Sequence, residues 1–172
     1  MNDKKTLSIW LLPDRSIINY KSIIGNISKS LNSVEIIPHI TLISSFNNSK
    51  NYSIQKLQGI LSNQAPFTLE PEKIDVGNTY FQSLCVTIKV DPIIRELRNK
   101  SLEYFKCKEK NCYKPHMSLA YGKHKKSEKD GVIDKSVKSL LDHKITISSV
   151  AIAENDEYNL KWKIIEKVYL ND

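Results

Sequence analysis

Two short segments of the chain are near copies of each other, and both carry residue types suited to acid–base chemistry. They are Pro38-His39-Ile40-Thr41-Leu42 and Pro115-His116-Met117-Ser118-Leu119, and both follow the pattern P-H-x-[ST]-L. Histidine is the side chain most easily held between its two protonation states near neutral pH, so two facing imidazoles can act as a base and an acid in one turnover. The hydroxyls of Thr41 and Ser118 add hydrogen-bond donors for non-bridging phosphate oxygens. We therefore expect a phosphodiester between the two segments, with water activated on one side of phosphorus and the leaving oxygen protonated on the other, without a metal.

The alternation of polar and apolar residues in these segments predicts how each is supported. On an extended strand successive side chains point to opposite faces, so His39 and Thr41 share one face, about 7 Å apart, while their apolar neighbours are buried on the other. The same holds for His116 and Ser118, and by this parity Tyr121 is expected to face the core. A lone His-x-Ser/Thr string is more often an ordinary core or edge feature. Two copies in a chain with four histidines favour a shared function.

The rest of the chain predicts an α+β fold in two halves. Apolar residues recur at helical spacing in some stretches and alternate in others. Asp91 and Pro92 are suited to cap and begin a helix, and several neighbouring strands look hairpin-linked. We therefore expect mainly antiparallel sheets with helices on their outer faces. Strands are expected at 7–12, 36–44, 67–76, 84–90, 116–121, 145–153 and 163–169, and helices at 17–31, 53–61, 91–105 and 129–141.

Length and cysteine content limit the class of protein. A chain of 172 residues has the size of one domain. No apolar run approaches the roughly 18 residues needed to cross a bilayer, and three cysteines make a disulfide framework a poor explanation. Cys107 and Cys112 could pair under oxidation, but they lack the second pair of ligands that a structural zinc site needs. These features indicate an intracellular, cytoplasmic protein.

Positive charge is concentrated in one stretch. The chain has 26 Lys and Arg against 19 Asp and Glu, a formal net charge of +7, and seven of the lysines lie between Lys106 and Lys126 with one acid, Glu109. Such a patch attracts phosphate-bearing partners, although a solvated lysine-rich loop has the same composition.

The paired motifs resemble those of the 2H phosphoesterase superfamily, which is named for two His-x-Thr/Ser motifs. Within it the chain looks most like the eukaryotic-type cyclic phosphodiesterases that open nucleoside 2′,3′-cyclic phosphates and ADP-ribose 1″,2″-cyclic phosphate. Besides the motifs, the strings that carry this likeness are Ser8-Ile9-Trp10-Leu11-Leu12-Pro13-Asp14 and Tyr80-Phe81-Gln82-Ser83-Leu84-Cys85-Val86.

The resemblance implies two pseudo-symmetric lobes whose antiparallel sheets line a central cleft, in a single bilobal domain over residues 1–172. It implies a catalytic tetrad of His39, Thr41, His116 and Ser118, and metal-free, cofactor-free opening of a cyclic ester to the 2′-phosphate or to ADP-ribose 1″-phosphate. We favour His116 as the group that activates water and His39 as the acid, with the reverse assignment open. The paired cysteines of the plant members have no clear match beyond Cys107.

Other residues are expected to contact the substrate. Tyr80, Phe81 and Gln82 precede a strand beside the expected cleft, where an aromatic ring could stack on a base. Trp10 and Tyr113 could also contact the nucleotide. Lysines at the end of the second motif, Lys123 above all, could attract an anionic substrate and hold its distal phosphate.

The sequence leaves three functions open. The leading hypothesis is a monomeric enzyme that acts on a small nucleotide, with RNA or oligonucleotide ends as possible partners and no membrane association. A second is a phosphodiesterase for 2′-5′ oligoadenylates or cyclic oligonucleotides. A third is a non-catalytic module that binds RNA ends through the basic segment.

Overall fold

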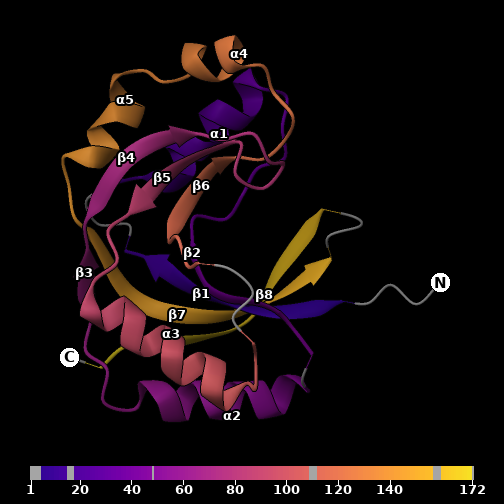
Figure 1. Ribbon diagram of the computed structural model, residues 1–172, viewed down its shortest axis with the longest axis vertical. Helices are drawn as coiled ribbons and strands as arrows, with labels where there is room; N and C mark the ends of the chain where they lie inside the picture. The colour runs from indigo at the N-terminus through magenta and orange to yellow at the C-terminus, as the bar shows by residue number, and fades with distance from the viewer. Residues whose placement is uncertain (1–4, 15–17, 48, 109–111, 157–159, 172) are drawn as a thin grey trace.

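One antiparallel sheet runs through the chain and carries both histidine motifs (Figure 1). The protein is described by a computed structural model over residues 5–14, 18–47, 49–108, 112–156 and 160–171. Its elements are β1 (Thr6–Pro13), α1 (Tyr20–Ser30), β2 (Ile40–Phe46), α2 (Lys50–Leu61), β3 (Phe67–Leu69), β4 (Pro71–Val76), β5 (Leu84–Ile88), α3 (Pro92–Tyr104), β6 (His116–Ala120), α4 (Lys126–Gly131), α5 (Lys135–Lys138), the short 3-10 helix η1 (Ser139–Leu141), β7 (Ile145–Asp156) and β8 (Lys161–Tyr169).

The eight strands form two groups that meet in the middle of the sheet. Their order is β3-β7-β1-β2-β6-β5-β4, and β8 pairs with β7 beside β3. Among the described residues β2 and β6 share one register pair, Ile40 with Met117, whereas β1 pairs with β7 along its whole length. The sheet is therefore continuous but narrow at the junction between the two motif strands.

Helices cover the outer side of each group (Figure 1). α3 packs on β2 and α2 packs on α3 and β8, whereas α1 packs on β6 and α4 on β4. The principal core lies between the helices and the sheet, and it includes Ile40, Leu42, Met117 and Leu119, all 2% exposed or less. The expected α+β class with mainly antiparallel strands and outer helices is confirmed.

Local residue chemistry accounts for most of the element boundaries. Asp91 caps α3 as expected, because its carboxylate accepts a hydrogen bond from the Ile94 amide and Pro92 begins the helix. α2 begins earlier than predicted, at Lys50, because Ser49 is extended and its hydroxyl accepts from the Tyr52 amide. Ser53, the first residue of the helix predicted at 53–61, is inside α2.

Two predicted elements are divided in the structure, and a third begins later than expected. The strand expected at 67–76 is two strands, because β3 pairs with β7 while β4 pairs with β5, so the chain changes partner at Glu70. The helix expected at 129–141 is α4, α5 and η1, because a new cap at Asp134 starts a second helix. β2 begins at Ile40 rather than at residue 36. Ile17, the first residue of the helix expected at 17–31, lies outside the described residues.

No helix in the described ranges combines the length and the apolar composition needed to span a membrane.

Gly77 and Gly59 offer a matched test of the turn that leads to Phe81 and Gln82. A Cβ on Gly77 would overlap the Gln82 carbonyl oxygen, whereas one on Gly59, in α2, meets no atom within 4 Å. We expect Gly77→Ala to lower the free energy of unfolding by roughly 1–3 kcal/mol in urea denaturation. Gly59→Ala should raise it by about 0.5–1 kcal/mol, because alanine is the better helix former. Equal effects of the two substitutions would contradict the tight turn.

Candidate active site

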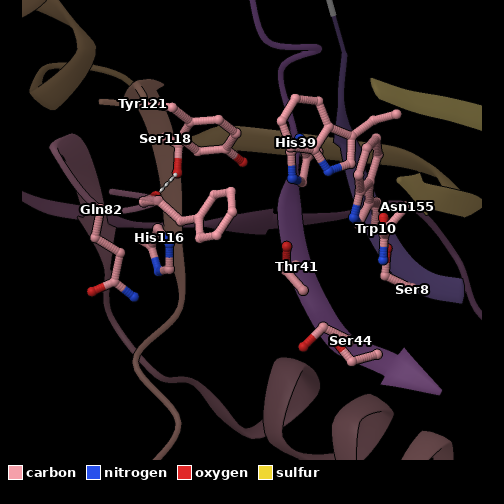
Figure 2. A pocket seen from close by; sticks show the side chains of 13 residues that line it. Ser8, Trp10, His39, Thr41, Ser44, Gln82, His116, Ser118, Tyr121 and Asn155 are labelled. Atoms are coloured by element: carbon pink, nitrogen blue, oxygen red, sulfur yellow. Dashed lines mark hydrogen bonds between the residues drawn. The ribbon is translucent and has the colours of Figure 1, made fainter. Parts of the chain in front are cut away.

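The Ile40–Met117 pair sets the positions of the two motifs. Because the strands are antiparallel, continuing this register places His39 opposite Ser118 and Thr41 opposite His116. The bridging residues point into the core, so the four polar residues point to the other face. Figure 2 shows them there, with His39 and Thr41 on one strand facing His116 and Ser118 on the other. The structure thus brings the expected tetrad together on one side of the sheet.

Both imidazole rings are oriented in the same way. The Nδ1 atom of His39 lies 2.6 Å from the carbonyl oxygen of Ile37, and that of His116 lies 2.9 Å from the carbonyl oxygen of Lys114. A carbonyl can only accept, so each Nδ1 carries a hydrogen and donates it. In each motif the acceptor lies two residues before the histidine, across a proline. The Nε2 atoms are therefore left to act on a substrate.

The two histidines differ in burial. His39 is 6% exposed, whereas His116 is half-buried. The Trp10 indole stacks on the His39 ring, with centroids 3.7 Å apart and planes 16° apart. Burial lowers the pKa of His39 to about 4, with a smaller lowering by His116, while the bond to Ile37 opposes the shift. His39 is therefore neutral at pH 7, with a lone pair on Nε2.

A cavity of about 230 Å³ lies between the motif strands. Both tetrad histidines and both hydroxyl residues border it, together with aromatic side chains at its rim. The side chains drawn in Figure 2 point into this space from strands distant in the sequence. The lining residues are Ser8, Trp10, His39, Thr41, Ser44, Ser45, Phe81, Gln82, His116, Ser118, Tyr121, Asn155 and Trp162.

Tyr121 belongs to the core, as expected, but it also borders this cavity, which the sequence did not predict. The register between β5 and β6 changes from Cys85–Ser118 to Leu84–Ala120, so β6 contains one extra residue at Leu119. Such a bulge reverses the alternation beyond it and turns Tyr121 toward the side of Ser118. Burial raises the pKa of Tyr121 to about 12, and its hydrogen bond with Ser118 opposes that shift. The phenol is therefore a neutral group beside the second motif.

The hydroxyl of Ser118 already has a partner. It donates to the Phe81 carbonyl oxygen at 3.2 Å, the dashed line in Figure 2. To donate to a phosphate it would have to rotate away from this carbonyl. Thr41 is half-buried and borders the cavity from the strand opposite His116.

The other residues expected to contact substrate divide into two groups. Trp10, Phe81 and Gln82 border the cavity, and Phe81 is 41% exposed at its rim. Tyr80 is not among the lining residues. Its ring instead contacts the Phe81 ring edge-on, with the two centroids 5.0 Å apart. Lys123 is exposed and likewise borders no part of the cavity.

Tyr113 fixes the backbone of the first motif instead of leaning over the cavity. Its hydroxyl donates to the Thr41 carbonyl oxygen at 3.0 Å. The Arg98 guanidinium, from α3, lies 4.1 Å from the Tyr113 ring centroid and donates to the Leu42 carbonyl oxygen. These two residues tie the segment before β6 and helix α3 to β2.

Besides Tyr121, five lining residues were not expected from the sequence: Ser8, Ser44, Ser45, Asn155 and Trp162. Ser8 and Trp10 share one strand face, and the Ser8 hydroxyl donates to the Asn155 side-chain oxygen at 3.0 Å. The signal for Ser8, Ser44 and Ser45 was present, because they lie close to Trp10 or Thr41 in the sequence. Asn155 and Trp162 reach the cavity through pairing with β1 and β7, which the sequence pattern does not reveal.

Within the part of the chain that the structure describes, no group of three or more His, Cys, Asp or Glu side chains has a metal-binding arrangement.

Solved structures share the fold of this chain. E. coli LigT complexed with 3′-AMP aligns with a TM-score of 0.62 at 10% identity, over 98% of this chain and 99% of that chain. LigT complexed with phosphate aligns with a TM-score of 0.57 at 11% identity, over 98% of both chains. A protein from Thermus thermophilus aligns with a TM-score of 0.59 at 12% identity, over 96% of this chain and 97% of that chain.

Sequence comparison identifies the family. The profile of the 2′-5′ RNA ligase superfamily matches residues 28–159. A curated Arabidopsis thaliana protein named cyclic phosphodiesterase is 22% identical over 134 residues, 77% of this chain and 74% of the relative. The chain therefore belongs to the 2′-5′ RNA ligase superfamily, which includes the 2H phosphoesterases. The expected superfamily and the expected enzyme class, a phosphodiesterase, are confirmed.

Burial of neutral His39 should make stability depend on pH. Its folded pKa, about 4, is below the unfolded value near 6.5, so between these values the unfolded chain binds a proton that the folded chain excludes. The free energy of unfolding should therefore fall by roughly 3 kcal/mol as the pH decreases from 6.5 to 4. Urea denaturation of the wild type and of His39→Gln measures the difference. If both proteins lose stability equally over this window, the low pKa is contradicted.

Proposed function

We propose that the protein hydrolyses a cyclic phosphodiester, a nucleoside 2′,3′-cyclic phosphate or ADP-ribose 1″,2″-cyclic phosphate, to the 2′-phosphate or to ADP-ribose 1″-phosphate, without a metal. The observation that carries this proposal is the pair of imidazoles on opposite walls of one cavity. Each ring is held by a carbonyl at Nδ1 and has Nε2 available. A phosphorus centre between them would have a proton acceptor on one side and a proton donor on the other.

The burial of His39 favours the reverse of the assignment expected from the sequence. A neutral imidazole with a lone pair on Nε2 is a base, and His39 stays neutral above a pH of about 4. His39 then takes a proton from water as the oxygen attacks phosphorus, the bond from phosphorus to the 3′ oxygen breaks, and His116 gives its Nε2 proton to that oxygen. The product carries the phosphate at the 2′ position. His116, half-buried, can regain its proton from solvent.

The dimensions of the cavity support a small reacting group. A volume of about 230 Å³ is below the usual range of about 300–1,000 Å³ for complete ligand sites. It suits a cyclic phosphate and its ribose, with the base outside. Phe81, Tyr121 and Trp162 stand edge-on or tilted to one another at the rim, with centroids 5.3–6.5 Å apart, and a base could stack on an exposed face there.

A linear 2′-5′ phosphodiester is the second candidate. The observation that favours it is a further hollow beyond His116, which shares that residue and Thr41 with the cavity. If His116 protonates the leaving oxygen, a nucleoside leaving group would lie on that side. A binding module without catalysis is the remaining alternative, and the assay below separates it from both enzymes.

Replacement of either histidine tests the proposal directly. We expect His39→Ala and His116→Ala to reduce turnover by about 10² to 10⁴. Phosphorus NMR of products from 2′,3′-cyclic nucleotides, ADP-ribose 1″,2″-cyclic phosphate and 2′-5′ dinucleotides, run in excess EDTA, identifies the substrate and the phosphate isomer released. His143→Ala, which alters a histidine that does not border the cavity, is the matched control.

Two kinds of result would contradict the mechanism. One is near-normal turnover in either tetrad variant, and the other is turnover that disappears in EDTA and returns with a divalent cation. Absence of turnover on the whole panel, with nucleotide affinity intact, would favour the binding module.

The roles of the two histidines predict different responses to an activated leaving group. A p-nitrophenyl ester of a nucleoside 2′-phosphate departs as a stable phenolate and needs little protonation. We expect His116→Ala to reduce turnover of this ester by a factor at least ten times smaller than the factor by which it reduces turnover of the cyclic phosphate. The loss in His39→Ala should stay the same. The opposite pattern would restore the assignment expected from the sequence.

A further inference from the structure

A second hollow continues from the catalytic cavity on the side of His116. It has a volume of about 630 Å³ and shares five lining residues with the catalytic cavity, so the two form one continuous cleft. The shared residues are Thr41, Ser44, Ser45, Gln82 and His116. The part that is not shared is walled by β2, by α3 and, before β6, by residues 107–108 and 112–114.

The charge of this hollow has one sign. Arg98, Lys108 and Lys114 line it, and no acid does among the described residues. In that same set neither lysine has an ion-pair partner. In a concave site the fields of such cations add, and they attract anionic groups.

The opposite end of the cleft is different. A hollow there shares Trp10 and Trp162 with the catalytic cavity, and its lysines are accompanied by acids. Glu154 in particular accepts ion pairs from Lys5 at 3.1 Å and from Lys50 at 2.7 Å. One end of the cleft is therefore aromatic and balanced in charge, whereas the His116 end is cationic.

The wall of the cationic end is held in place. Arg98 donates to the Leu42 carbonyl oxygen and lies on the Tyr113 ring, and Tyr113 donates to the Thr41 carbonyl oxygen. Arg98 thus contributes a fixed positive charge. Lys108 and Lys114 are exposed and provide ammonium groups that can reach a ligand.

We propose that this hollow binds a second phosphate of the substrate, beyond the one that is cleaved. The proposal rests on the proposed function, because it takes the scissile phosphate to lie between the histidines. It defines the substrate class as a nucleotide with a further phosphate on the same sugar or in a pyrophosphate, rather than a bare nucleoside cyclic phosphate. The base would then extend toward Trp162 and Phe81.

The residues involved differ from those expected. The sequence suggested Lys123 for a distal phosphate, but Lys123 borders neither hollow. Lys108 and Lys114 precede the second motif, and the path of the chain before β6 brings them beside His116.

Binding of two ligands that differ by one phosphate tests the subsite without catalysis. Adenosine 2′-monophosphate and adenosine 2′,5′-bisphosphate are titrated into the full chain by calorimetry. The wild type should bind the bisphosphate at least about tenfold more tightly, as expected for a charge-assisted contact. In Lys108→Gln/Lys114→Gln the ratio of the two Kd values should fall to within about twofold. Lys123→Gln/Lys125→Gln is the control with the same loss of charge, and it should keep the wild-type ratio.

Each other outcome overturns the subsite. The subsite is contradicted if the wild type binds both ligands equally or binds neither. It is also contradicted if the preference for the bisphosphate survives Lys108→Gln/Lys114→Gln, or if both double variants lose that preference equally. Circular dichroism confirms that every variant is folded before titration. Failure of the proposed function is distinguishable, because a preference for the bisphosphate can persist in a protein that turns over no cyclic phosphate.

Discussion

Backbone pairing between Ile40 and Met117 is the constraint on which the site depends. These residues stand between the histidine and the hydroxyl residue of each motif, so one antiparallel pair places all four polar side chains. Ile40 and Met117 are fully buried. If either strand reversed its two faces, its buried residue would be exposed to water. A shift of one residue would send the imidazoles into the core. The apolar residues of the motifs therefore hold the polar ones together on one face of the sheet.

The near-symmetry of the motifs ends at the level of burial. Both rings donate from Nδ1 to a carbonyl two residues earlier, yet His39 is covered by Trp10 while His116 reaches solvent. Two histidines of similar local geometry thus differ in their contact with water. Burial keeps His39 neutral at pH 7, whereas the His116 ring is open to solvent. The same asymmetry extends along the cleft, with aromatic rings at one end and cations at the other.

The sequence was sufficient to predict that the four polar side chains of the motifs lie on one face of the sheet, because alternation along a strand is a local property. His39 and Thr41 share a face for the same reason that Ile40 is buried, and that reasoning needed no partner strand. The sequence was insufficient where the pairing between strands decides which way a side chain points or where a strand ends. The bulge at Leu119 redirects Tyr121, and the change of partner at Glu70 divides one predicted strand. Asn155 and Trp162 enter the site from strands whose neighbours only the folded sheet defines. The low pKa of His39 depends on the residues that bury it, Trp10 among them. The spacing of the motif does not reveal those residues.

The two tryptophans of the chain, Trp10 and Trp162, both border the catalytic cavity. Indole emission is sensitive to the polarity of its surroundings and to rings in contact with it. Light emitted by this protein on excitation at the tryptophan band therefore originates at the cavity, because both indole rings border it. Occupancy of the cleft, and the charge on the ring that stacks against Trp10, can be followed optically in the unlabelled protein.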